Sequence, residues 1–149
     1  MLTDFILASL HHVLIFVMMA IIAIELVAVR PGLGGPNLGR IAGVDGALGG
    51  VAVAIVIVGV CRVIFGLKGW EAYVYNVWFW HKMATFAIAG ALSAVPTMRI
   101  LRWRKAAAAD PAFVVPDGEI SAVRRYIHLE AGIFLLIPIF AAAMARYGY

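Results

Sequence analysis

The hydrophobic positions of the chain fall into four long runs, which are separated by short segments rich in polar residues, glycine and proline. A helix needs about 20 apolar residues to cross the hydrocarbon core of a bilayer. The runs that meet this requirement cover about residues 5–29, 46–65, 72–101 and 126–145. The first run lacks the basic start and small-residue cleavage site of a signal peptide, so we expect it to remain as a span. The pattern predicts an all-α fold, a transmembrane four-helix bundle that forms a single membrane domain over residues 1–149.

The basic residues gather on one side of the predicted spans, in the first connection and in or beside the third. Basic residues near the ends of spans stay in the cytoplasm. We therefore expect both termini to lie on the periplasmic side of a bacterial inner (cytoplasmic) membrane. The residues that set this orientation are Arg30, Arg40, Arg99, Arg102, Arg104, Lys105, Arg124 and Arg125.

The composition excludes several classes of protein. The chain is 64% hydrophobic and 13% charged, whereas a soluble domain is roughly half apolar and about a quarter charged. A cytosolic enzyme, a nucleic-acid-binding module and a disordered tail are therefore not expected. The net charge of +4 then reflects orientation in the lipid bilayer, and no nucleic-acid partner is predicted. The single cysteine, Cys61, excludes a disulfide framework and a cysteine-rich metal site.

Histidines at matching depth indicate a cofactor site in the outer half of the bundle. Ionisable residues inside spans are costly and are candidates for function. His11 and His12 lie about two turns into the first span, and His81 lies about two turns into the third, so all three reach roughly 10 Å inside the outer boundary. Two imidazoles from facing helices of a bundle can hold the iron of haem b. His11 and His12 point about 100° apart, so at most one of them faces the site.

Further residues at this depth fit the same hypothesis. Arg62 and Lys82 are placed to pair with the propionates of a haem near the outer surface. Trp78, Phe79, Trp80 and Phe86 would wall a flat porphyrin, although an aromatic belt at the membrane interface explains the two tryptophans equally well. We therefore predict that haem b binds through His81 and one of the two histidines of the first span.

The inner half of the bundle holds a second set of ionisable residues. Glu25 ends the first span, Arg99 ends the third, and His128 and Glu130 begin the fourth. One interpretation is a buried network of ion pairs that locks the bundle. The alternative is a proton relay or a site for a quinone head group, because quinone reduction needs a proton donor near the electron carrier.

Two other features leave alternatives open. Scattered methionines, together with His11, His12 and Cys61, offer ligands suitable for copper, although methionine is also a common apolar filler. The segment 46–50 has the small-xxx-small spacing that lets helices approach closely in lipid. This glycine face indicates close helix packing within the bundle or in a homodimer, or a seam toward a partner in a larger membrane complex.

Two stretches of sequence carry a family resemblance. The first runs from Trp78 through Pro96-Thr97 to Arg102-Trp103-Arg104, and the second runs from Ile137 to Gly148. They resemble an uncharacterised family of bacterial four-helix membrane proteins, domain of unknown function 2214. The likeness covers almost the whole chain, and it implies the four-helix membrane fold without an activity.

More distantly, the layout is similar to HemJ-type protoporphyrinogen oxidase and to copper-resistance D-type membrane proteins. HemJ-type proteins carry a histidine in the first span and a tryptophan-rich segment leading into a lysine, positions that His11 or His12 and Lys82 match. Their Arg…Glu element is approximated by Arg125 and Glu130 with altered spacing. This resemblance implies haem b in the bundle and an oxidase that acts on a porphyrinogen.

The sequence thus favours a haem b-binding membrane protein with a redox role, as an electron carrier that exchanges electrons with a quinone or as an oxidase of a porphyrin precursor. Two alternatives remain open. One is a copper or small-molecule permease lined by the same polar groups, and the other is a cofactor-free small subunit of a membrane complex.

Overall fold

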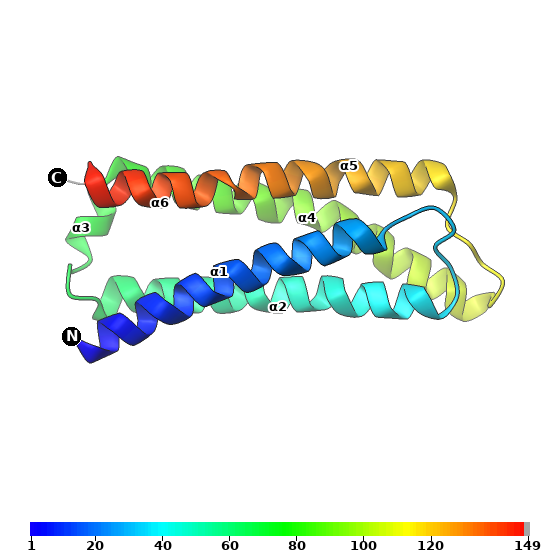
Figure 1. Cartoon of the computed structure of the whole chain (residues 1–149), viewed down its shortest axis with the longest axis horizontal. Coiled ribbons are helices and arrows are strands. Elements are labelled where there is room, and N and C mark those ends of the chain that lie inside the picture. Colours follow the sequence, from blue (N-terminus) through cyan, green and yellow to red (C-terminus); the bar gives the residue numbers. More distant parts are fainter. Residues whose placement is uncertain (148–149) are drawn as a thin grey trace.

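The computed structural model describes residues 1–147 and consists of helices that run side by side along one axis (Figure 1). The long ones are α1 (Leu2–Ala28), α2 (Pro36–Phe65), α4 (Val77–Ala109) and the consecutive pair α5 (Asp117–Phe134) and α6 (Leu136–Arg146). A short helix, α3 (Glu71–Val74), lies in the second connection. Four helical segments are long and apolar enough to cross a membrane, α5 and α6 together forming the fourth. The predicted all-α membrane fold is confirmed.

The bundle is built from two helix pairs, α1 with α2 and α4 with α5–α6, and contacts of α2 with α4 and of α1 with α5 join the pairs. Residues 2 and 146 lie at the same end, which we call the outer end, and the opposite end is the inner end (Figure 1). The location of the outer end on the periplasmic side stays a prediction. Large apolar side chains such as Phe5, Phe16 and Ile57 are exposed along the bundle, as expected of surfaces that face lipid.

The helices extend beyond most of the apolar runs. Pro36 begins α2 because proline is favoured in the first turn, where its missing N–H is not needed. Its 30 residues span about 45 Å, which exceeds a hydrocarbon core of about 30 Å. The polar helix ends therefore project from the apolar region, and an apolar pattern does not reveal them. The third long helix begins later than expected, at Val77, where the Asn76 side chain accepts a hydrogen bond from the Trp78 N–H (2.9 Å).

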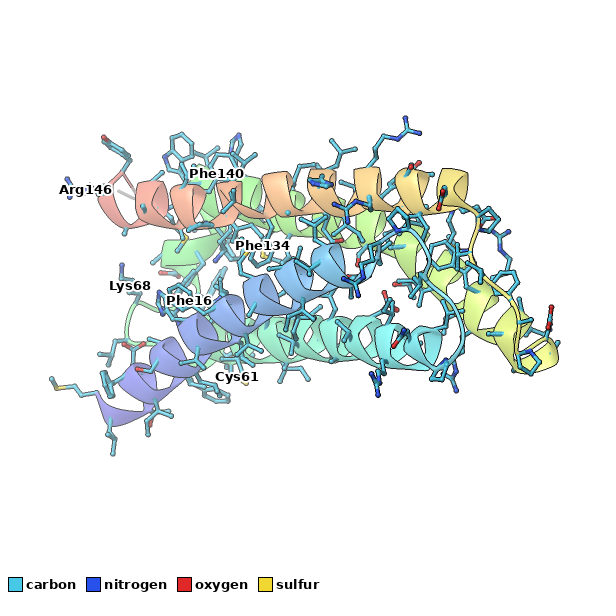
Figure 2. The ribbon with its side chains drawn as sticks, turned by 45° about the vertical axis from the view of Figure 1, so that its right-hand side comes forward. Phe16, Cys61, Lys68, Phe134, Phe140 and Arg146 are labelled. Carbon is cyan, nitrogen blue, oxygen red and sulfur yellow. The ribbon has the colours of Figure 1, made fainter. Side chains whose placement is uncertain are left out.

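The fourth span is interrupted at Leu135, between α5 and α6. Pro138 has no N–H to donate to the Phe134 carbonyl, and its ring crowds the preceding turn. The break therefore has a local cause in the sequence. It lies where the buried Phe134 side chain enters the space between the two helix pairs (Figure 2).

The first and third connections, both at the inner end, are tied together. The Val115 N–H donates to the Leu33 carbonyl (2.9 Å), and Gly34 forms an isolated bridge with Val114. A Cβ atom at Gly34 would lie 2.7 Å from the Phe113 carbonyl oxygen, so this close approach requires glycine. The third connection is thus part of the packed structure, although its proline-rich sequence is also typical of a plain connector.

Arg124 on α5 closes the inner end of α1. Its guanidinium donates hydrogen bonds to the carbonyl oxygens of Leu26 (2.6 Å) and Val29 (2.7 Å). The last carbonyls of a helix have no partner within the helix. The Arg124 side chain supplies these partners from a neighbouring helix.

We expect Arg124→Ala to lower the free energy of unfolding by about 1.5–3 kcal/mol, because hydrogen bonds from a charged donor are lost at partly buried acceptors. Denaturation of the reconstituted protein with sodium dodecyl sulfate measures the change. Arg125→Ala is the matched control, since Arg125 is exposed and makes none of these contacts. Equal losses in the two variants would contradict the role of Arg124.

Candidate functional site

A cavity of about 250 Å³ lies near the outer end, between α1, α2, α4 and the junction of α5 with α6. We call it the outer cavity. Its walls are mostly aliphatic and aromatic, and they include the Phe134 ring (Figure 2). The polar side chains that line it are His11 from α1, Arg62 from α2, Tyr73 from α3 and Lys82 from α4. Three helices therefore bring nitrogen-bearing groups into one apolar space.

Gly59 on α2 allows the His11 ring to pack against the helix. A Cβ atom added at Gly59 would lie 3.4 Å from His11 Cε1. By contrast, Cβ atoms at Gly46, Gly49 and Gly50 would meet no atom within 4 Å. The expected close packing along segment 46–50 therefore does not occur within this chain, and a homodimer through that face stays a prediction.

His11 differs from the other histidines in its hydrogen bonding. The Nδ1 atoms of His12, His81 and His128 each lie 2.6–2.8 Å from the carbonyl oxygen four residues earlier in their helix. His11 Nδ1 is buried and has no hydrogen-bond partner within residues 1–147. A buried polar atom without a partner costs about 1–3 kcal/mol. In the described part of the chain, His11 is therefore the histidine with a buried, unpartnered ring nitrogen in the outer cavity, whereas the other three, which keep Nε2 free, are exposed.

Within residues 1–147, neither cation of the outer cavity has an acidic partner. Arg62 Nε is buried without a hydrogen bond, and Lys82 Nζ lies 5.4 Å from the centre of the Phe79 ring, in a cation–π contact. The sole ion pair that the structure contains in residues 1–147 joins Arg102 to Glu119, at 3.4 Å and at the inner end. The outer cavity thus combines apolar walls with two unpaired positive charges, an arrangement that favours an anionic group.

The structure distinguishes between the three histidines predicted for this layer. His11 lines the outer cavity, whereas His12 is exposed on the other side of α1. His81 is also exposed, and its ring packs against Trp78 and Phe140, with centroids 5.5 and 5.7 Å apart. It is not among the residues that line the outer cavity. The expected pairing of His81 with a histidine of the first span is therefore not formed in this arrangement.

The reason lies in helix rotation. Successive residues of a helix point about 100° apart, and the part of α4 that faces the cavity includes Lys82 and Met83 but not His81. Lys82 on α4 turns inward, and His81 turns to the aromatic surface that α4 forms with α6. Matching depth along two helices does not determine which side chain faces inward.

The predicted inner network also differs from the observed one. Glu25 and Glu130 are each 1% exposed, and all four of their carboxyl oxygens lack a hydrogen-bond partner within residues 1–147. Arg99 forms no ion pair there, and His128 is exposed with its Nδ1 at the Arg124 carbonyl. The interpretation as a lock of buried ion pairs is therefore not supported.

A third buried acidic residue, which the apolar pattern does not reveal, lies near these glutamates. Asp45 on α2 is 5% exposed, and its carboxylate accepts a hydrogen bond from the Thr97 hydroxyl on α4 (2.7 Å). Its charge is close enough to interact with those of Glu25 and Glu130. We call Glu25, Asp45 and Glu130 the inner carboxyl cluster. A start of the second helix at Pro36 would have placed Asp45 inside a span and marked it as a candidate.

Comparison with known proteins identifies the family. The family model described as predicted membrane protein (DUF2214) matches residues 3–148. The chain belongs to this family. No curated protein and no solved structure matches the chain. The family description identifies a membrane protein and names no activity. The function of this DUF2214 protein therefore has to be argued from its two polar sites.

Metal chemistry is limited by the positions of the ligands. Within residues 1–147, no group of three or more His, Cys, Asp or Glu side chains is placed to hold a metal ion. Met83 and Met144 line the outer cavity together with His11, whereas Cys61 does not. The outer cavity of this DUF2214 protein therefore offers one imidazole, two thioethers and two cations.

Proposed function

We propose that this protein binds an amphiphilic molecule with a flat apolar body and acidic groups in the outer cavity, and that this molecule is haem b. The observation that carries the proposal is the unpartnered, buried Nδ1 of His11 in the same apolar space as Arg62 and Lys82. An imidazole with an open nitrogen is a ligand for haem iron. Two unpaired cations match the two propionates.

The residues of the outer cavity fit such a molecule in three respects. His11 would hold the iron, Arg62 and Lys82 would orient the propionates, and Phe79, Phe86 and the other apolar walls would exclude water. The volume of about 250 Å³ is just below the roughly 300–1,000 Å³ of pockets that enclose drug-sized ligands. The bound molecule would therefore keep part of its apolar surface in lipid. When bound, haem supplies one-electron redox chemistry.

This assignment uses His11 as the single histidine ligand, since His81 faces the α4–α6 surface. A redox role follows from the cofactor. The partner for electron transfer would be a membrane-soluble molecule such as a quinone or a porphyrin precursor, because the outer cavity lies within the four membrane-spanning segments. We place the protein in a bacterial inner membrane with the outer cavity toward the periplasm, on the basis of the basic residues at the inner end.

Copper transport is the competing function, and one observation favours it. His11, Met83 and Met144 line the same cavity, and imidazole and thioether groups are ligands for copper. Arg62 and Lys82 oppose it, because two positive charges in an apolar cavity repel a metal cation strongly. The same charges attract an acidic ligand, so we favour the haem proposal. A small-molecule permease lined by the same polar groups is the second candidate, but Leu135 keeps helical backbone angles, so the fourth span lacks the unwound break typical of such permeases.

The proposal is tested by titrating the purified apoprotein with haemin and recording the absorption spectrum. We expect His11→Ala to weaken binding on the order of tenfold or more, because the iron loses its protein ligand. His12→Ala is the matched control, since it removes an adjacent imidazole that is exposed and outside the outer cavity. Equal affinity of the His11→Ala and wild-type proteins would overturn the assignment.

A second arm of the titration separates haem from copper. The double substitution Arg62→Gln and Lys82→Gln should weaken haemin binding, whereas Lys68→Gln, which changes an exposed cation outside the outer cavity, should not. Copper(I) binding would respond in the opposite direction, because removal of the two cations relieves repulsion. Tight copper binding without haemin binding would favour the permease. Binding of neither ligand would favour a cofactor-free subunit.

A further inference from the structure

The inner carboxyl cluster has an unusual environment for acidic groups. Glu25 comes from α1, Asp45 from α2 and Glu130 from α5, and each is at least nine-tenths buried. Thr97 on α4 donates a hydrogen bond to Asp45, and the hydroxyl of Ser93 on α4 lies beside Glu130. The four long helices therefore converge on three carboxyl groups, and the oxygens of both glutamates lack a hydrogen-bond donor within the described residues.

The cations of the surrounding helices do not neutralise the cluster. On α5, Arg124 is engaged by the Leu26 and Val29 carbonyls at the end of α1. On α2, Arg40 is exposed, and the exposed His128 of α5 bonds a carbonyl of its own helix. On α4, Arg99 makes no ion pair with any acidic residue in the part of the chain that is described. No positive side chain therefore balances these three groups.

A carboxylate without a cation or a hydrogen-bond donor is strongly disfavoured in an apolar interior. The two glutamates are such groups, whereas Asp45 has the Thr97 hydroxyl as a donor. Three carboxylates that interact with one another are disfavoured further, because like charges repel. A metal ion would relieve the charge, but within residues 1–147 no set of three His, Cys, Asp or Glu ligands is placed to hold one. A proton is the cation that each carboxyl group can bind by itself, without any ligand geometry.

We propose that Glu25, Asp45 and Glu130 form a proton-binding site in the inner half of the bundle, occupied by protons at neutral pH. Each proton comes from water at the inner end and joins a carboxylate oxygen to give a neutral carboxylic acid. Glu130 lies one helical turn before Phe134, whose ring lines the outer cavity. The site thus lies about one turn of α5 from the outer cavity, on its inner side.

The experiment is infrared spectroscopy of the reconstituted protein, which detects the carbonyl stretch of protonated carboxylic acids. At neutral pH the wild-type protein should show this band, and the band should shift to lower frequency in D₂O and disappear as the pH is raised. Exposed Asp and Glu side chains, with ordinary pKa values near 4, do not contribute at that pH. Absence of the band at neutral pH would overturn the proposal, and this measurement needs no variant.

The substitutions Glu25→Gln and Glu130→Gln assign the band. Each should remove part of its intensity, because glutamine has the same shape and no carboxylic acid. Glu71→Gln is the matched control, since Glu71 is exposed in the short helix α3 and should contribute nothing. A band that both Glu25→Gln and Glu130→Gln leave unchanged would show that the protons are held elsewhere. The proposal does not depend on haem, because the band is measured on the apoprotein.

Discussion

Replacing Gly59 with leucine is expected to abolish haemin binding while the bundle stays folded. A Cβ atom at this position already meets His11 Cε1 at 3.4 Å, so the rest of a leucine side chain would occupy the space where the ligand contacts the imidazole. The cavity of about 250 Å³ cannot hold both. Leucine is also a better helix former than glycine by about 1 kcal/mol, so α2 itself should not weaken. Haemin titration and circular dichroism measure the two effects.

Gly50→Leu provides the control for this prediction. It introduces the same side chain into the same helix, at a position where a Cβ atom meets nothing within 4 Å. We expect Gly50→Leu to bind haemin as the wild-type protein does. Gly59→Ala should have an intermediate effect, because its single methyl group makes an ordinary contact with the ring. Unchanged haemin affinity in a folded Gly59→Leu variant would show that the ligand binds outside the outer cavity.

Replacing Trp103 with alanine is expected to destabilise the bundle more than any other single change discussed here. Trp103 on α4 is 2% exposed, and its indole N–H donates to the Glu119 carboxylate on α5 at 2.6 Å. Truncation of a buried aromatic side chain costs about 3–5 kcal/mol, and loss of the donor leaves the carboxylate with only the longer contact to Arg102. The free energy of unfolding, measured in sodium dodecyl sulfate, should fall by that amount.

Two further variants separate packing from hydrogen bonding. Trp103→Phe retains most of the buried ring but lacks the donor, so we expect it to cost about 1.5–3 kcal/mol, the usual value for a hydrogen bond to a charged group. Trp70→Ala removes an indole that is 54% exposed in the second connection and should cost much less. If Trp70→Ala lowered the free energy of unfolding as much as Trp103→Ala, the contact between α4 and α5 would not explain the loss of stability in Trp103→Ala.

The apolar runs were sufficient to predict the number of membrane-spanning segments and the all-α fold, because burial in lipid requires long uninterrupted apolar helices. They were insufficient for the helix ends. Asp45 lies inside α2, and Asp117 begins α5 well before the expected start near Tyr126. Polar residues at these ends are stabilised by neighbouring helices or project from the hydrocarbon region, and neither effect appears in a hydropathy pattern.

The sequence was also insufficient to predict which side chains of each helix face the outer cavity. Depth along a helix follows from counting residues, and it correctly placed His11, Arg62 and Lys82 in one layer. The rotation of each helix depends on how its whole surface packs, and this excluded His81 from the outer cavity. Sequence spacing on separate helices contains no information about that rotation. Only the packed bundle shows that His81 lies outside the outer cavity.

The inner half shows how a buried charge can be misinterpreted. The sequence selects Glu25 and Glu130 as candidates, because acidic residues inside spans are rare and costly, and both are buried in the bundle. Their predicted partners, Arg99 and His128, share the same depth but make no ion pair with them within residues 1–147. Because these residues lie at similar depths along their helices, the sequence suggested that a cation neutralises the two glutamates. The packed helices instead place a third carboxyl group, that of Asp45, near them.

The central claim is that the outer cavity binds haem b through His11, and the absorption spectrum of the protein purified from haem-replete cells tests it most directly. We predict a coloured preparation whose α-band appears on reduction with dithionite. The reduced spectrum should shift with carbon monoxide, because His11 is the single histidine that lines the outer cavity. The α-band should be absent in His11→Ala and present in His12→Ala and His81→Ala. A colourless preparation, or a reduced α-band that survives in His11→Ala, would contradict the account.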